Sequence, residues 1–378
     1  MTVYLDASAT TPVDKRVADL VMRYLTEEFG NAGSRTHEIG HAAQTAVARA
    51  RRQVAQVVHC TDDEVIFTSG ATEANNIALL GLASEGERTG KRHIVSTAIE
   101  HKAVLEPLQR LASSGFEVDL VKPDPSGRVS AEQIAAKVRP DTLVVSMMAA
   151  NNETGVIQPV PQLCRLLKDE PPYLHIDAAQ AFGKIVPELQ HHRIDLISAS
   201  GHKIFAPKGV GALIARKRGF RRPPLTPLLV GGGQERGLRP GTLPVALIAG
   251  LGLASELALT EHADRQASCA AYRQEVLRGL APLHPQVHGA AEHTMAHVLN
   301  LSLPGLDSEA VMVAWRGLLA VSNGSACTSA SYEPSHVLTA MALPQDQVRS
   351  ALRLSWTHMT ESVDWQEAVA RVRDLITA

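Results

Sequence analysis

The chain has no excess of charge of either sign, no long apolar run and no paired cysteines. Its 378 residues carry 37 Lys and Arg against 39 Asp and Glu, which gives a formal net charge of −2. Such a balance supplies no basic field that would attract nucleic acid, so direct nucleic-acid binding is not expected. The composition, 45% hydrophobic and 20% charged, is that of an ordinary globular protein, and the length predicts two domains.

Segments that would direct the chain to a membrane are also missing. Residues 1–6 show neither the basic start nor the apolar run of a signal peptide. The most apolar long segment, residues 244–259, contains Ser255 and Glu256 and is too short and too polar to span a bilayer. We therefore expect a cytoplasmic protein with no membrane partner.

The cysteines, at positions 60, 164, 269 and 327, show no metal-binding or redox spacing. A disulfide framework is not expected in a chain of this length, and no metal site is predicted. Cys164 and Cys269 lie in helical patterns and are expected to be small buried apolar residues, whereas Cys60 is expected in a loop. Cys327 lies among small, hydroxyl-bearing residues in 324–331. It is therefore either a solvent-facing loop thiol or a reactive one.

Short apolar runs alternate with helical patterns up to about residue 258. Residues 38–58 show helical spacing of apolar side chains. The runs that resemble strands buried between helix layers are 65–67, 93–96, 142–148, 173–176 and 195–198. This alternation predicts an α/β domain with a mainly parallel sheet. Beyond it, two helical stretches that meet near His262, a strand at 297–303 and a helix from Ser308 predict a smaller α+β domain.

A turn at Ser69 and Gly70 follows one predicted strand and opens a helix at Ala71 and Thr72. Gly70 would let the backbone approach a ligand, and the free N–H groups of the helix start favour an anion such as phosphate. A plain turn with Ser69 as N-cap explains the same residues. The turn matches neither the P-loop nor the G-x-G-x-x-G fingerprint, so nucleoside triphosphates and dinucleotides are poorly supported.

Asp177, Lys203 and His101 each follow an apolar strand. They would lie at the edge where open α/β sheets bind ligands. An Asp beside a pyridinium nitrogen and a Lys that forms a Schiff base are the two groups that a pyridoxal 5'-phosphate (PLP) enzyme requires. Taken alone, Lys203 is better explained as a solvated lysine, and His101 is equally a helix cap or a proton carrier. Because the three residues would meet at one edge of the sheet, the sequence favours a PLP-binding site over these separate explanations.

These residues, together with several others, resemble the cysteine desulfurases of the NifS/IscS branch of the class V aminotransferase family. The matching motifs lie at residues 4–12, 30–37, 69–76, 100–101, 151–155, 177–180, 200–203, 231–242 and 324–331. No single motif is decisive, but their order and spacing are specific. Within the family, the resemblance is greatest to the desulfurases of bacterial DNA phosphorothioation.

The resemblance implies the PLP-dependent transferase fold type I and a homodimer. The large PLP-binding domain would comprise residues 13–258, with a mainly parallel seven-stranded sheet. Residues 1–12 and 259–378 would form the small α+β domain.

The resemblance also implies a role for each site residue. Lys203 would be the Schiff-base lysine, Asp177 would bind the pyridine nitrogen and Gln180 the ring hydroxyl. His101 would stack on the ring and transfer protons. The residues implied to hold the phosphate are Ala71, Thr72, Ser200, His202 and, from the neighbouring subunit, Thr242.

Asn152 and Arg353 would hold the substrate carboxylate, for which an Arg fork is suited. Cys327 would receive the substrate sulfur as a persulfide. The implied reaction converts L-cysteine to L-alanine, and the persulfide then supplies an acceptor protein in iron–sulfur cluster assembly or DNA phosphorothioation. A selenocysteine lyase or another class V PLP aminotransferase remains the alternative, since it would share Lys203 and Asp177. A non-catalytic scaffold protein is less favoured, because the chain retains all four residues that the chemistry needs, namely Lys203, Asp177, His101 and Cys327.

The sequence departs from the family pattern at Ala206, Trp356 and Ala32, where glycine, glycine and proline are usual. A bulky Trp356 near Arg353 could reshape the pocket or restrict the segment that carries Cys327.

Overall fold

The computed structural model describes residues 2–168, 171–323 and 334–377. Its largest element is a seven-stranded sheet with the strand order β2-β8-β7-β6-β5-β3-β4. The strands are β2 (Val65–Thr68), β3 (His93–Thr97), β4 (Glu117–Val121), β5 (Thr142–Met148), β6 (Tyr173–Asp177), β7 (Leu196–Ser200) and β8 (Gly211–Ala215). Only β8 runs antiparallel to its neighbours, β2 and β7, and the other pairs are parallel. The predicted mainly parallel sheet is confirmed.

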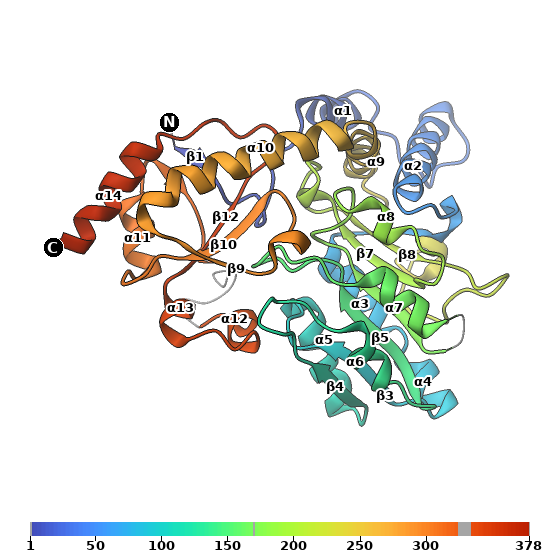
Figure 1. Cartoon of the computed structure of the whole chain (residues 1–378). Coiled ribbons are helices and arrows are strands. Elements are labelled where there is room, and N and C mark those ends of the chain that lie inside the picture. The colour runs from blue at the N-terminus through green and yellow to red at the C-terminus, as the bar shows by residue number, and fades with distance from the viewer. Residues whose placement is uncertain (1, 169–170, 324–333, 378) are drawn as a thin grey trace.

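Helices cover both faces of this sheet, as Figure 1 shows. The helices up to residue 260 are α1 (Lys15–Thr26), α2 (Glu38–Val57), α3 (Ala71–Leu80), α4 (Ala83–Thr89), α5 (Lys102–Ser113), α6 (Ala131–Ala136), α7 (Val160–Leu167), α8 (Val186–Leu189) and α9 (Val245–Thr260). Val144 packs in the cluster that includes α3 and α5, and the next residue, Val145, packs in the cluster that includes α2, α7 and α9. Successive strand residues face opposite sides, so a strand that is apolar throughout is buried between two helical layers.

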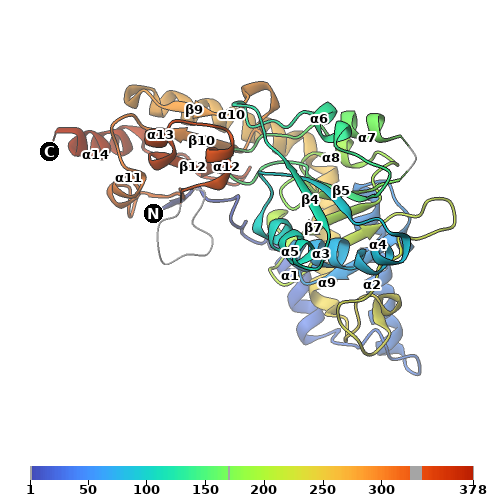
Figure 2. The same cartoon turned by 90° about the horizontal axis from the view of Figure 1, so that it is seen from below.

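The C-terminal part of the chain is built around a small antiparallel sheet with the order β12-β10-β9. Its strands are β9 (Gln286–His288), β10 (Val298–Ser302) and β12 (Ala351–Ser355). Its helices are α10 (His262–Leu280), α11 (Ser308–Ala314), α12 (His336–Ala340), α13 (Gln345–Arg349) and α14 (Trp365–Thr377). This part lies beside the large sheet rather than on top of it (Figure 2).

The N-terminal segment belongs to the C-terminal part in space. Strand β1 (Val3–Tyr4) pairs in parallel with β11 (Leu319–Ala320), and Leu5 is buried in the same apolar cluster as Trp315 and Trp356. Figure 1 shows β1 among the elements of the C-terminal part. This pairing supports the predicted division into residues 13–258 and residues 1–12 with 259–378, whose boundaries stay a prediction.

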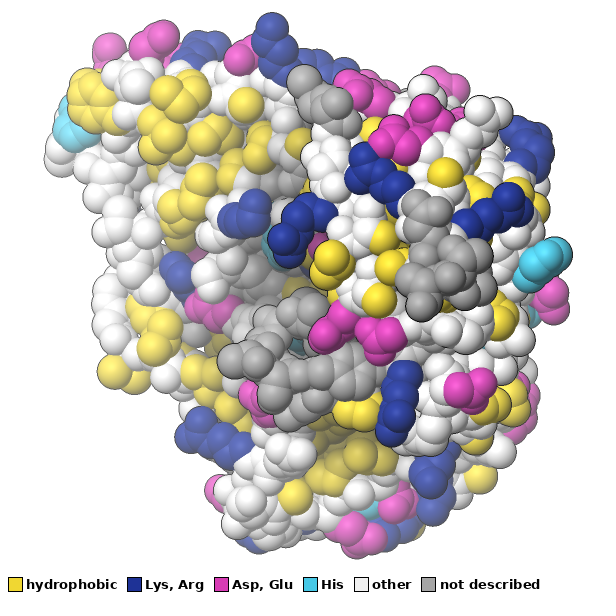
Figure 3. All heavy atoms as spheres, turned by 90° about the vertical axis from the view of Figure 1, so that its left-hand side faces the viewer, with side chains coloured by type: hydrophobic (Ala, Val, Ile, Leu, Met, Phe, Trp, Pro, Cys, Tyr) yellow, Lys and Arg dark blue, Asp and Glu magenta, His cyan; other side chains and the backbone are white. Residues whose placement is uncertain are grey.

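Helices α9 and α10 meet at Glu261 at an angle of 74°. Among the described residues, no single helix has the length and apolar character needed to cross a membrane, and only this bent pair passes such a test when taken jointly. On the face seen in Figure 3, acidic and basic side chains are interspersed and neither sign gathers into one field.

Candidate active site

A cleft of about 430 Å³ opens at the carboxyl-terminal ends of the parallel strands. Such an edge is where open α/β sheets bind ligands. The predicted site residues that line the cleft are Ala71, Thr72, His101, Asn152, Asp177, Gln180, Ser200, His202, Lys203 and Arg353. The structure thus brings together residues from six separate segments. Of the predicted residues, Thr242 is exposed and does not line this cleft, and Cys327 lies outside the described residues.

The start of helix α3 forms one wall of the cleft. Gly70 is its N-cap and adopts φ 157° and ψ −177°, a region that is essentially restricted to glycine. The first-turn N–H groups of a helix have no partner within the helix, and here they belong to cleft-lining residues Ala71 and Thr72. The hydroxyl of Ser200 lies 3.6 Å from where a Cβ on Gly70 would be. The wall therefore has the geometry and the dipole for a phosphate.

Asp177 is the last residue of β6 and is only 5% exposed. Its carboxylate accepts hydrogen bonds from Asn75 Nδ2 and from the backbone N–H of Ala179, both at 2.8 Å. Burial raises the pKa of Asp177, while these two hydrogen bonds and the nearby cations of the site act in the opposite direction. A buried carboxylate that faces a cleft needs a proton-bearing or cationic partner, and a protonated ring nitrogen would provide one.

Lys203 ends the short turn that follows β7, and its side chain reaches across to the N-terminal segment. Its Nζ donates to the carbonyl oxygens of Ser8 at 2.5 Å and Ala9 at 2.7 Å. The amide of Gln180 is held in the same place, because its Nε2 donates to Ser8 at 2.9 Å. The Oε1 of Gln180 is buried without a hydrogen-bond partner. This unpaired acceptor fits a ligand hydroxyl.

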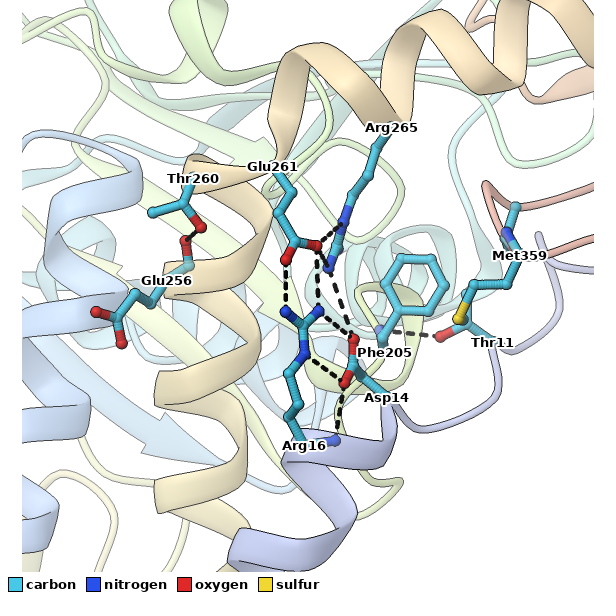
Figure 4. A network of polar contacts seen from close by, with 10 residues as sticks. Thr11, Asp14, Arg16, Phe205, Glu256, Thr260, Glu261, Arg265 and Met359 are labelled. Atoms are coloured by element: carbon cyan, nitrogen blue, oxygen red, sulfur yellow. Dashed lines mark hydrogen bonds and ion pairs between the residues drawn. The ribbon is translucent and has the colours of Figure 1, made fainter.

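The turn after Lys203 is fixed by contacts with the N-terminal segment and the α9–α10 bend. Phe205, at φ 69°, donates its backbone N–H to Thr11 Oγ1 at 2.9 Å, and Arg265 lies over its ring at 4.9 Å. Figure 4 shows the ion pairs that hold this corner, in which Glu261 contacts both Arg16 and Arg265. The lysine is thus presented on a rigid turn.

His101 is the N-cap of α5, which is one of the two roles that the sequence left open for it. Its Nδ1 accepts a hydrogen bond from the backbone N–H of Ala103 at 3.0 Å. The neutral ring must therefore carry its proton on Nε2. Burial lowers the pKa of His101, which keeps the ring neutral at physiological pH and able to exchange protons.

Arg353, on β12, is 2% exposed. Its Nη2 contacts Asp6 Oδ1 at 2.6 Å and its Nη1 donates to the backbone carbonyl of Asn152 at 2.9 Å. Its Nε is buried without a hydrogen-bond partner. The sequence reasoning missed Asp6, which neutralises and orients this guanidinium. The only available signal was its place in the N-terminal motif.

The other residues that sequence reasoning missed are Asn75, whose amide holds Asp177, and the carbonyls of Ser8 and Ala9. Asn75 lies in α3, one turn after the start of that helix, and is 1% exposed. A buried asparagine on an apolar helix was the signal that could have identified it, because such an amide needs partners.

Trp356 does not line the cleft, so of its two expected effects a reshaped pocket is not seen, and an effect on the segment that carries Cys327 lies outside the described residues. Trp356 is fully buried, its Nε1 donates to the carbonyl of Cys269 at 3.0 Å, and its ring lies 5.5 Å from that of Tyr272. It does not line the cleft, but lines a separate small cavity with Lys184 and His297. The glycine-to-tryptophan departure is therefore accommodated by the packing of helix α10.

The thiols of the described cysteines are poorly suited to nucleophilic chemistry. Cys164 and Cys269 are buried, as predicted, and Cys60 is partly buried. Burial raises the pKa of Cys60 and of Cys164 to about 12 and that of Cys269 to about 11. Because the thiolate is the reactive form, none of the three is ionised appreciably at neutral pH.

Comparison with known proteins agrees with this fold. The profile of the Aminotransferase class-V family matches residues 3–366, so the chain belongs to this family of PLP-dependent enzymes. It is 42% identical over 375 residues to the cysteine desulfurase IscS of Methylococcus capsulatus, covering 99% of this chain and 92% of the relative. It is 41% identical to the mitochondrial cysteine desulfurase of Saccharomyces cerevisiae, covering 99% and 75%. Within the class V family, the chain belongs with the cysteine desulfurases.

Solved structures confirm the fold type. DndA from Streptomyces lividans is 54% identical with a TM-score of 0.82, and the match covers 94% of this chain and 99% of that one. A NifS-like protein is 35% identical with a TM-score of 0.89, covering 99% and 98%. SspA, solved in complex with cysteine, is 34% identical with a TM-score of 0.82, covering 94% and 98%.

Proposed function

We propose that this protein is a PLP-dependent cysteine desulfurase that converts L-cysteine to L-alanine and retains the sulfur on Cys327. The observation that carries the proposal is the convergence in one cleft of the α3 start, the buried carboxylate of Asp177 and the amine of Lys203. The described structure and the relatives named as cysteine desulfurases support it together.

The residues of the cleft fit PLP at each of its polar groups. The α3 start with Ser200 and His202 would hold the phosphate, Asp177 the ring nitrogen and the unpaired Oε1 of Gln180 the ring hydroxyl. Lys203 would bind the cofactor covalently. When bound, PLP supplies an electron sink for a carbanion at the substrate Cα.

Arg353 is the group that would orient the substrate. A guanidinium offers paired donors to a carboxylate, and the contacts with Asp6 and Asn152 hold this one in place before substrate arrives. Preorganisation of this kind lowers the entropy that binding must overcome. The arginine is thus proposed to fix the α-carboxylate end of L-cysteine while the thiol end remains available.

Two groups of the cleft are proposed to move protons. Lys203, displaced by the substrate amine, is the base that would take the Cα proton. His101, neutral with its proton on Nε2, would exchange a proton with the substrate thiol. Its lowered pKa keeps it in this form at neutral pH.

In the proposed sulfur transfer, one S–S bond forms and one C–S bond breaks. The Cys327 thiolate forms an S–S bond with the substrate sulfur as the substrate Cβ–S bond breaks. The electron pair of the broken bond stays on carbon, which takes up a proton and leaves as L-alanine. The net reaction converts L-cysteine and an enzyme thiol to L-alanine and an enzyme persulfide, without an external oxidant.

A homodimer and a sulfur-acceptor protein are also proposed. Thr242 is exposed here and available to a neighbouring subunit, and the same stretch exposes Leu229 by 56% and Val230 by 92%. Exposed apolar groups of this kind favour an interface.

The 54% identity to DndA favours an acceptor in DNA phosphorothioation over one in iron–sulfur cluster assembly. The cytoplasmic location and the absence of direct nucleic-acid binding stay predictions.

The decisive experiment is an assay with L-cysteine as the only amino acid and no 2-oxo acid. We expect L-alanine and sulfide in equal amounts in the presence of a reducing thiol. Alanine formation that requires a 2-oxo acid would identify an aminotransferase instead. A strong preference for L-selenocysteine in a parallel assay would favour the lyase.

Asp177→Asn is expected to reduce turnover by about 10²–10³-fold, because a neutral amide cannot stabilise a protonated ring nitrogen in a buried site. The PLP content should change little, since the phosphate wall and Lys203 remain. Asp19→Asn, a change of an acid in α1 outside the cleft, is the matched control. Wild-type turnover by Asp177→Asn would refute the assigned role.

A further inference from the structure

Three side chains with metal-ligand atoms gather at the end of the large sheet opposite the cleft. His93 and Glu117 are the first residues of β3 and β4, whereas the cleft lies at the carboxyl ends of the parallel strands. Strand β4 is the last of the sheet on this side and lies beside β3 (Figure 1). In residues 2–168, 171–323 and 334–377, one group of three such side chains has all its ligand atoms within 4.8 Å of one another, namely His93, Glu117 and Asp119.

Strand pairing assembles this cluster. In the parallel ladder between β3 and β4, His93 is paired with Glu117 and Val95 with Asp119. Residues two positions apart on a strand point to the same face, so both carboxylates lie on one face of β4, next to the His93 ring. The spacing of histidines and cysteines along the chain predicted no metal site, because these three residues meet only through the register of two strands.

The imidazole of His93 is the observation that points to a ligand. It is 0% exposed, and its Nε2 has no hydrogen-bond partner. This nitrogen lies 3.6 Å from Asp119 Oδ2, which is too long for a hydrogen bond. Two ligand atoms on one tetrahedral Zn²⁺ are about 3.3 Å apart, so the observed separation is close to that of a shared ion. Such an ion would also satisfy the buried nitrogen, whose unpaired state is costly.

The other ring nitrogen of His93 has a partner suited to a metal-binding histidine. Its Nδ1 lies 2.8 Å from Thr142 Oγ1, and this oxygen also accepts the backbone N–H of Arg139 at 2.7 Å. A hydroxyl oxygen has two lone pairs and can accept from both nitrogens. With the proton on Nδ1, the lone pair of Nε2 faces Asp119. A hydrogen bond of this kind orients the ring in known metal sites.

The cations around the cluster would leave room for an ion. Lys137 Nζ lies 3.4 Å from Asp119 Oδ2, but its side chain is more than half exposed, and such ion pairs contribute little. Arg139 donates to both carboxylate oxygens of Glu117, at 2.9 and 2.8 Å, and also to Asp141. Each oxygen of Glu117 keeps a further lone pair. The hydrogen bonds from Arg139 hold the pKa of Glu117 low, so this carboxylate is ionised at neutral pH, as a ligand must be.

We propose that His93, Glu117 and Asp119 bind one Zn²⁺ at the edge of the sheet, with water in the fourth position. An imidazole nitrogen and carboxylate oxygens are ligands of Zn²⁺, and the nitrogen favours it over Mg²⁺ and Ca²⁺. The ion would tie the edge strand β4 to β3. Because the site lies at the end of the sheet opposite the cleft, its effect is on stability and not on the reaction. The inference goes beyond the proposed function and does not depend on it.

The test measures Zn²⁺ binding to the full-length, PLP-loaded protein by calorimetry and by thermal unfolding. We expect one Zn²⁺ per chain at this site and a rise in Tm of a few degrees at about a hundredfold excess over the Kd. Asp119→Asn and Glu117→Gln should each weaken binding at least about tenfold. Both side chains reach the surface, so these variants should fold. Without added Zn²⁺, their turnover with L-cysteine should equal that of the wild type.

The controls separate this site from other zinc ligands. Asp141→Asn removes an acid that also pairs with Arg139 but is no ligand, so binding should be unchanged. Lys137→Met removes the cation that competes for Asp119 and should tighten binding about two- to fivefold. Absence of Zn²⁺ binding by the wild type would leave the cluster as plain ion pairs and overturn the inference. Wild-type affinity in Asp119→Asn, or binding that disappears in Cys327→Ser, would assign the ion to another place and overturn it equally.

Discussion

Replacing Lys203 by alanine is expected to abolish L-alanine formation, with a loss of at least about a thousandfold. The substitution removes both the amine that would bind PLP covalently and the base that would take the Cα proton. The structure holds this amine on two backbone carbonyls, those of Ser8 and Ala9, so neighbouring cleft groups cannot replace it without rebuilding the turn. The measurements are turnover with L-cysteine and the cofactor content after denaturation.

The control is Lys217→Ala. Lys217 forms a partly exposed ion pair with Asp63 at 3.0 Å, and such pairs contribute little to stability. This variant should keep wild-type turnover and PLP content. Turnover within tenfold of wild type in Lys203→Ala would rule out the assigned role of Lys203. A different lysine would then have to bind PLP and take the Cα proton.

Replacing Cys327 by serine is expected to abolish the enzyme persulfide and to reduce L-alanine formation by at least about a hundredfold. A hydroxyl at this position cannot accept the substrate sulfur as a persulfide. PLP binding and the spectral change on addition of L-cysteine should persist, because the described cleft is built without this residue. Mass spectrometry of the Cys327 peptide after a single turnover measures the persulfide directly.

Cys60→Ser provides the matched control for the thiol. Cys60 is the least buried of the described cysteines, yet burial raises its pKa to about 12, so it should carry no persulfide and its loss should not alter turnover. A persulfide on Cys60 in the Cys327→Ser protein would move the nucleophile assignment to a different part of the molecule.

The convergence of Gly70, Asp177 and Lys203 was predictable because of one geometric rule. Each follows a strand of the same predicted sheet, and the carboxyl ends of parallel strands share an edge. The helical spacing of residues 38–58 was equally informative, since α2 spans Glu38–Val57. The antiparallel strand β8 was not predicted as a strand, because its run Gly211–Ala215 contains glycine and alanine in place of the usual β-branched residues.

The contacts that complete the site could not be derived from spacing. Asp6 meets Arg353 and Ser335 meets Glu153 through packing of distant segments, and no periodicity records such pairs. A short polar residue such as Ser335 has several equally good local roles, as a cap or a turn residue. Only the assembled fold shows which partner it has. Trp356 illustrates the reverse case, since its place in the sequence near Arg353 suggested a role in the cleft that its burial excludes.

The pairing of Asp6 with Arg353 has a consequence for the order of events during synthesis. These two residues are 347 positions apart in the chain, and Ser8 is 195 positions from Lys203. At about 5–20 residues per second, the ribosome takes roughly 20–70 s to pass from the first partner to the second. During that interval Asp6 has no arginine to orient. A nascent chain can therefore form the Asp6–Arg353 ion pair only after residue 353, and hence after Cys327, has been added.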